Sequence, residues 1–130
     1  MKKDNSPNSV FDQIVSSVVL HLKQQGFSAV KANANGYATP LKVKWDEEHE
    51  GVVPDITGEH QGSVYVFDIE TGDRINRNKA EDRWRLLSAF ARRNNGKFYL
   101  IVPEKKASYV QEVAEDLKVQ TEFLRLSGIE

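Results

Sequence analysis

Three acidic residues in the middle of the chain are placed where they could share one metal ion. Asp68 and Glu70 stand two residues apart, and Asp55 lies upstream of them. Residues two apart on a β-strand point to the same face and lie roughly 7 Å apart at Cα, so their side chains can converge on one cation. Mg²⁺ takes oxygen ligands and keeps several waters, so two or three carboxylates are enough to hold it. Such an ion polarises a phosphodiester and generates a hydroxide near neutral pH, which predicts phosphodiester hydrolysis.

A predicted β-hairpin positions these acids. Residues 52–57 form its first strand and residues 63–71 its second, and Gly58 and Gly62 give the connection its conformational freedom. The second strand alternates, so its two acids share a face with two valines. Because Asp and Glu are disfavoured within a β-pattern, their presence there indicates a functional role.

The hairpin resembles the PD-(D/E)xK nuclease superfamily, which has the restriction endonuclease-like fold. The matching residues are Pro54-Asp55 and Asp68-Ile69-Glu70, with Glu70 at the position of the family's lysine. Some family members carry an acid there and are active, whereas others have lost activity. The resemblance implies a nuclease that uses Mg²⁺ or Mn²⁺, with Asp55, Asp68 and Glu70 as metal ligands and catalytic residues.

A basic helix is predicted to follow the hairpin, over residues 78–94, with Asn78 as its N-cap and Glu81 three residues on. Lys79 or Arg83 could replace the missing lysine, and Lys79 is included among the predicted catalytic residues. Arginine suits phosphate because its fork donates two hydrogen bonds. The predicted nucleic-acid contacts are Arg74, Arg77, Lys79, Arg83, Arg85 and Arg92. The alternative is an ordinary solvated helix surface with pairs such as Glu81–Arg85.

Length and composition limit the chain to one ordinary globular domain. It has 130 residues, 39% hydrophobic and 28% charged, with a net charge of −1. It has no cysteine, no apolar run of about 20 residues and no apolar stretch behind its N-terminal lysines. We therefore expect a cytoplasmic protein with no membrane contact. Residues 1–8 are predicted to be a flexible segment, and residues 9–130 a single nuclease-like α/β domain.

The predicted order of elements agrees with the family core. Amphipathic helices are predicted over residues 9–25 and 104–118, in addition to the basic helix. The predicted strands, besides the hairpin, cover residues 27–34, 41–45, 97–102 and 119–126. The strand over residues 97–102, the helix over 104–118 and the strand over 119–126 form a crossover, which predicts that the two strands pair in parallel. The fold class is therefore α/β, with a central mixed β-sheet of four to six strands flanked by helices.

Two functions remain open on sequence alone. The first is a metal-dependent endonuclease acting on DNA or RNA, with DNA as the expected partner. The second is a catalytically inactive nuclease-like domain that binds nucleic acid or another protein. A homodimer would enlarge the binding surface, although no sequence feature indicates an interface. Because carboxylates held together without a metal repel each other, Asp68→Asn is expected to stabilise the metal-free protein.

Overall fold

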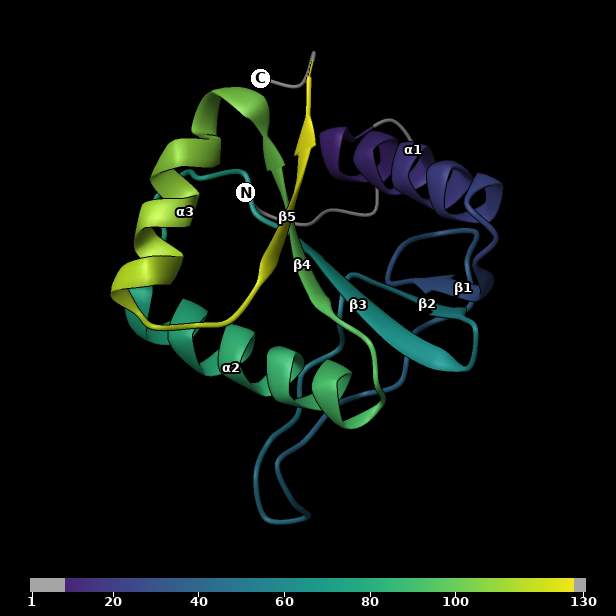
Figure 1. Cartoon of the computed structure of the whole chain (residues 1–130), viewed down its shortest axis with the longest axis horizontal. Helices are drawn as coiled ribbons and strands as arrows, with labels where there is room; N and C mark the ends of the chain where they lie inside the picture. Colours follow the sequence, from purple (N-terminus) through teal and green to yellow (C-terminus); the bar gives the residue numbers. More distant parts are fainter. Residues whose placement is uncertain (1–8, 128–130) are drawn as a thin grey trace.

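Sequential strands form a mixed sheet with helices on both faces (Figure 1). The computed structural model describes residues 9–127, and within them the sheet has five strands in the order β1-β2-β3-β4-β5. The elements are α1 (Val10–Gln24), β1 (Ser28–Ala32), β2 (Ile56–His60), β3 (Ser63–Ile69), α2 (Arg77–Arg93), β4 (Phe98–Pro103), η1 (Glu104–Lys106), α3 (Ala107–Asp116) and β5 (Glu122–Leu126). The predicted α/β class with a mixed sheet of four to six strands is confirmed. The predicted flexible segment, residues 1–8, lies outside the described residues.

The pairing of β2 with β3, β3 with β4 and β4 with β5 follows from the connections between these strands. β1, β2 and β3 pair antiparallel, whereas β3 pairs with β4, and β4 with β5, in parallel. A short turn can join only antiparallel strands, and a parallel pair needs a crossover, which here contains a helix. The predicted parallel pair at the C-terminal end is confirmed. Among the described residues, no helix combines the length and the apolar content needed to cross a bilayer.

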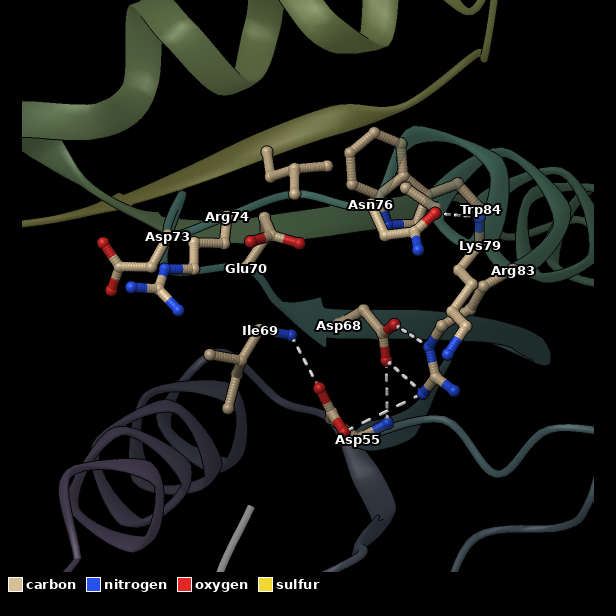
Figure 2. A pocket seen from close by; sticks show the side chains of 12 residues that line it. Asp55, Asp68, Ile69, Glu70, Asp73, Arg74, Asn76, Lys79, Arg83 and Trp84 are labelled. Carbon is tan, nitrogen blue, oxygen red and sulfur yellow. Dashed lines mark hydrogen bonds and ion pairs between the residues drawn. The ribbon is translucent and has the colours of Figure 1, made fainter. Parts of the chain in front are cut away.

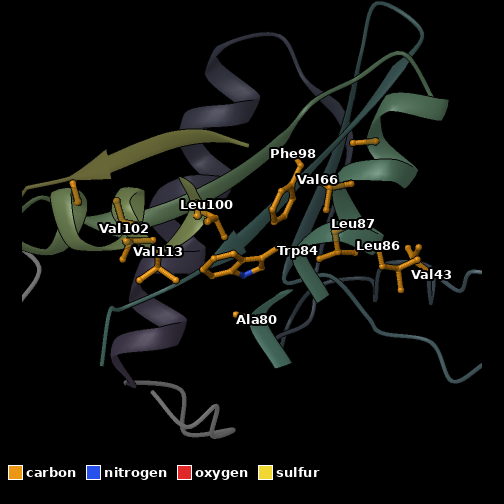
Figure 3. Packing of buried hydrophobic residues seen from close by; sticks show 14 residues of the cluster. Val43, Val66, Ala80, Trp84, Leu86, Leu87, Phe98, Leu100, Val102 and Val113 are labelled. Carbon is orange, nitrogen blue, oxygen red and sulfur yellow. The ribbon is translucent and has the colours of Figure 1, made fainter. Parts of the chain in front are cut away.

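Two hydrophobic clusters fill the space between the sheet and its helices. One lies under α1, and the other lies between the sheet and the pair α2 and α3. In the second cluster Trp84 packs against Leu100 and Val113 and is 2% exposed (Figure 3). Because a burial of this size stabilises a side chain by about 2–3 kcal/mol, Trp84 strongly fixes the position of α2 over the sheet.

The predicted hairpin exists, but its register differs from the expectation. β2 begins at Ile56, and Gly58 lies inside the strand opposite Tyr65 instead of in the turn. A Cβ at Gly58 would lie 3.1 Å from the Phe27 ring, so the glycine leaves room for that ring to pack on the strand. The turn itself consists of Gln61 and Gly62, both with positive φ.

The predicted strand over residues 41–45 is wrong, because only an isolated bridge between Val43 and Val52 forms there. Residues 41–45 instead belong to a long connection between β1 and β2, which extends away from the sheet (Figure 1). Val43 is 3% exposed, whereas the lysines on either side of it are exposed. The alternating apolar and basic residues therefore reflect the burial of Val43 alone and not a β-strand.

A close backbone contact joins the end of α2 to β3. A Cβ at Gly96 would lie 1.8 Å from the carbonyl oxygen of Val64, so only glycine fits there. The Val64 N–H also donates to the carbonyl of Asn94 at 3.2 Å. This contact holds the C-terminal end of α2 directly against β3, and the site described below lies at the opposite end of both elements.

Candidate functional site

Two buried aspartates face each other where β2 and β3 diverge. Ile56 and Phe67 are the last pair of the antiparallel ladder, so its register brings Asp55 opposite Asp68 one position beyond its end. The two residues are 1% and 3% exposed. The Asp55 N–H donates to Asp68 Oδ1 at 3.0 Å, and the Ile69 N–H donates to Asp55 Oδ2 at 2.8 Å. Backbone donors from both strands therefore fix both carboxylates.

Arg83 of α2 supplies the positive charge for this pair (Figure 2). Its Nε donates to Asp68 Oδ2, and its Nη2 donates to Asp68 Oδ1 at 3.0 Å. The same Nη2 donates to the carbonyl of Val53 at 2.8 Å and lies 3.9 Å from Asp55 Oδ1. A guanidinium that forms two parallel bonds to one carboxylate combines charge with fixed geometry.

The position of Arg83 affects its ionisation. Burial by itself lowers the pKa of Arg83, but the hydrogen bond and the charge of Asp68, with the charge of Asp55, outweigh burial and raise that pKa. Since arginine is charged at any physiological pH, Arg83 is a permanent cation inside this cluster.

Glu70 lies directly after β3 but does not join the other two acids. Its Oε2 accepts a hydrogen bond from the Gly72 N–H at 2.9 Å. In Figure 2 its carboxylate points away from Asp55 and Asp68. Burial raises the pKa of Glu70, the bond from Gly72 lowers it in part, and the charge of Asp68 raises it further. Glu70 is therefore a carboxyl group that is costly to ionise in the folded state.

A cavity of about 310 Å³ brings together all four residues that the sequence predicts to be catalytic, namely Asp55, Asp68, Glu70 and Lys79. It lies at the N-terminal end of α2, where the observed N-cap is Asn76 and not the predicted Asn78. The Asn76 side chain accepts from the Lys79 N–H at 3.1 Å, which caps the helix one half-turn earlier.

The six predicted nucleic-acid contacts separate into two groups. Three of them line the cavity, namely Arg74, Lys79 and Arg83. The other three face α3, β5 or the segment between them. Arg77 Nη1 lies 3.3 Å from Asp116, Arg85 binds Glu81 and the Leu117 carbonyl, and Arg92 Nη1 lies 3.3 Å from the Gln120 side chain. The predicted basic surface is therefore not one continuous patch.

Two of the residues that the family resemblance implies as metal ligands are already engaged within the chain. Carboxylate oxygens are suitable ligands for Mg²⁺ or Mn²⁺. However, both oxygens of Asp68 accept from Arg83, and between residues 9 and 127 no three His, Cys, Asp or Glu side chains are grouped to hold a metal ion. Asp55, Asp68 and Glu70 as metal ligands, and Mg²⁺ or Mn²⁺ as cofactor, therefore stay predictions.

The pairing of Arg83 with the two aspartates was missed by sequence reasoning, which assigned Arg83 to phosphate. A signal for it exists in the helix pattern. Arg83 follows Ala80 by three residues and precedes Leu87 by four, so it lies on the buried stripe of α2. A charged residue on a buried stripe requires a partner of opposite charge, and the buried acids of the hairpin supply it.

Removing one partner of this ion pair tests its contribution to stability. Asp68→Asn should lower the free energy of unfolding by about 3–5 kcal/mol, because it leaves the charge of Arg83 partly uncompensated. This reverses the expectation from repulsion between the acids alone. Asp73→Asn, which alters an exposed acid of the same cavity, should change stability by less than about 0.5 kcal/mol. Urea unfolding of wild type, Asp68→Asn and Asp73→Asn measures these differences in stability. An Asp68→Asn variant that is more stable than wild type would show that repulsion between Asp55 and Asp68 outweighs their attraction to Arg83.

The raised pKa of Glu70 predicts a pH dependence of stability. The folded protein holds this proton more tightly than the unfolded chain, so this contribution to stability is fully present below the unfolded pKa. It is lost as the pH rises through the folded pKa. Glu70→Gln keeps an acceptor for Gly72 and removes the ionisation.

The variant should therefore be more stable than wild type at pH 7, and the difference should shrink toward about pH 4. Unfolding curves across this range measure it, with Glu104→Gln, an exposed acid, as the matched control. A difference between Glu70→Gln and wild type that is the same at every pH contradicts the assignment.

Comparison of the chain with models of known protein families gives no match, and comparison with curated proteins gives none either. The function must therefore be argued from the residues of the site.

Proposed function

We propose that this chain is a nuclease-like domain that binds nucleic acid without cleaving it. One observation carries the proposal. Arg83 bonds to both oxygens of Asp68 and lies 3.9 Å from Asp55, so a cation of the chain already occupies the position that hydrolysis would need for a metal. In this pair the charge of Asp68 is already compensated, and both of its oxygens are engaged by Arg83.

The proposed phosphate contacts lie at the N-terminal end of α2. The first turn of this helix contains no acidic residue, so the positive end of the helix dipole is not offset there. Arg74 and Lys79 are exposed and add two positive charges beside it. Because four acids also line the cavity, its interior repels phosphate, and the contact is proposed for the outer surface of this helix end.

Salt dependence of DNA binding tests this proposal. Each phosphate contact contributes about −0.9 to the slope of log K against log salt on duplex DNA. Arg74→Gln/Lys79→Gln should therefore flatten the slope by about 1.8. Arg77→Gln/Arg85→Gln removes the same charge from α2, but from side chains that contact Asp116 and Glu81, and should change the slope less. Fluorescence anisotropy at several salt concentrations gives both slopes.

Two results would reject the proposed contact. The first is an equal effect of the two double variants, which would show that only the total charge of the chain matters. The second is no measurable binding of the wild type to duplex or single-stranded DNA at low salt, which would favour a protein partner instead.

Phosphodiester hydrolysis is the second candidate function, and a specific observation favours it. Asp55, Asp68, Glu70 and Lys79, predicted as catalytic from sequence, line one cavity. Hydrolysis would require Arg83 to leave Asp68. Plasmid and single-stranded DNA should be incubated with the protein and Mg²⁺ or Mn²⁺, beside a chelator control and Glu70→Gln. Metal-dependent cleavage that Glu70→Gln abolishes would make hydrolysis the function, and absence of cleavage by the wild type would remove it.

Either function is proposed for the cytoplasm, in keeping with a sequence that has no cysteine. A homodimer, which would double the proposed phosphate surface, stays a prediction.

A further inference from the structure

The guanidinium of Arg83 is surrounded by the kind of oxygen atoms that bind a hard metal ion. Its Nη2 lies 3.0 Å from Asp68 Oδ1, 2.8 Å from the Val53 carbonyl oxygen and 3.9 Å from Asp55 Oδ1. Carboxylates and backbone carbonyls are typical ligands of Mg²⁺ and Ca²⁺ in proteins. The chain thus contains a set of cation ligands and, from α2, a cation of its own.

We propose that Arg83 is a tethered cation that occupies a divalent-cation site between Asp55 and Asp68. The wild-type chain binds no divalent ion there, and replacing Arg83 with an uncharged side chain opens the site to one. This inference rests on the ion-pair geometry that also carries the non-cleaving part of the proposed function, and its test needs no nucleic acid.

Arg83 excludes a metal ion for three physical reasons. It is always charged, and its fork matches the carboxylate of Asp68 with two hydrogen bonds. It is also part of the chain, so its local concentration at the acids does not depend on the solution. A divalent ion, in contrast, must lose waters to enter, which Mg²⁺ does reluctantly.

Without Arg83, the same acids favour a divalent ion. Asp55 and Asp68 are almost completely buried, and burial of two carboxylates requires compensation. Two carboxylates and one guanidinium have a formal charge of −1, whereas a divalent cation in its place brings this sum to 0. The backbone donors from Asp55 and Ile69 would still hold both side chains in position.

The site is reachable from solvent and carries its own optical probe. The exposed residues Asp73, Arg74 and Lys79 line the same cavity as the two aspartates. Trp84 also lines it, so its indole lies close enough to report a bound ion. Tb³⁺, which takes oxygen ligands as Ca²⁺ does, emits when a nearby tryptophan transfers excitation to it.

The experiment titrates Tb³⁺, and then Mn²⁺ as competitor, into wild type, Arg83→Met and Arg83→Met/Asp68→Asn without nucleic acid. Methionine keeps the unbranched apolar stem of the side chain and removes the charged group at its end. Arg83→Met should show saturable emission with one ion per chain and an affinity at least about tenfold above wild type, or about 1.4 kcal/mol. The double variant should lose this emission. It keeps the acidic residues beside Trp45, namely Asp46, Glu47, Glu48 and Glu50, so emission from ions bound there would persist.

Thermal melts give an independent readout. Arg83→Met should melt below wild type in chelator and rise with millimolar Mn²⁺, because an ion that binds only the folded state stabilises it. Arg83→Lys, which keeps a charge but not the fork, should bind Tb³⁺ with intermediate affinity. The proposal is overturned if wild type binds one Tb³⁺ in an Asp68-dependent way. It is equally overturned if Arg83→Met gains no binding, or does not fold even with Mn²⁺.

Discussion

The charge of two buried aspartates is the constraint to which the rest of this structure responds. Asp55 and Asp68 lie beneath α2 with almost no solvent contact, in a position where uncompensated carboxylates would cost several kcal/mol. Arg83 answers this requirement by binding Asp68 with two nitrogens and the Val53 carbonyl with one. One side chain therefore joins α2, β3 and the segment that leads into β2.

Two other contacts of α2 fix the position of Arg83. At the C-terminal end, Gly96 lets the chain touch the backbone of β3. In the middle, Trp84 fills the layer between helix and sheet. With these two points fixed, the turn of α2 that carries Arg83 lies over the end of the β2–β3 ladder. A rotation of the helix would expose Trp84 and separate Arg83 from Asp68 together, so hydrophobic packing and the ion pair support the same arrangement.

The sequence predicted the framework better than the site. Strong periodic patterns, such as the apolar run of β4 and the buried stripe of α2, correctly predicted an α/β fold. The strand predicted over residues 41–45 failed because a single buried valine in a long connection produces the same alternation. Gly58 was placed in the turn because glycine is typical there, whereas its actual role is to make room for Phe27.

The helix pattern indicates that Arg83 needs an acidic partner, but local patterns do not identify which acid it is. Arg83 lies 15 residues from Asp68 and 30 from Val53, so their contact depends on how α2 crosses the sheet. Read locally, the acids resemble a metal site and the arginines resemble phosphate contacts. Tertiary packing brings Arg83 into contact with Asp68, so neither side chain has the role that its local pattern predicts.

Nuclear magnetic resonance of the Arg83 side chain measures the central ion pair most directly. In ¹⁵N-labelled protein, the Nε–H group of Arg83, assigned by its loss in Arg83→Met, should exchange slowly with water. Its chemical shift should stay unchanged when millimolar Mg²⁺ is added. Slow exchange that persists with Mg²⁺ is the predicted result, because the Nε–H group donates to Asp68 Oδ2 and can exchange only when that bond opens. Fast exchange like that of the exposed Arg74, or a shift that saturates with Mg²⁺, would contradict the account by showing that Asp68 is available to a metal ion.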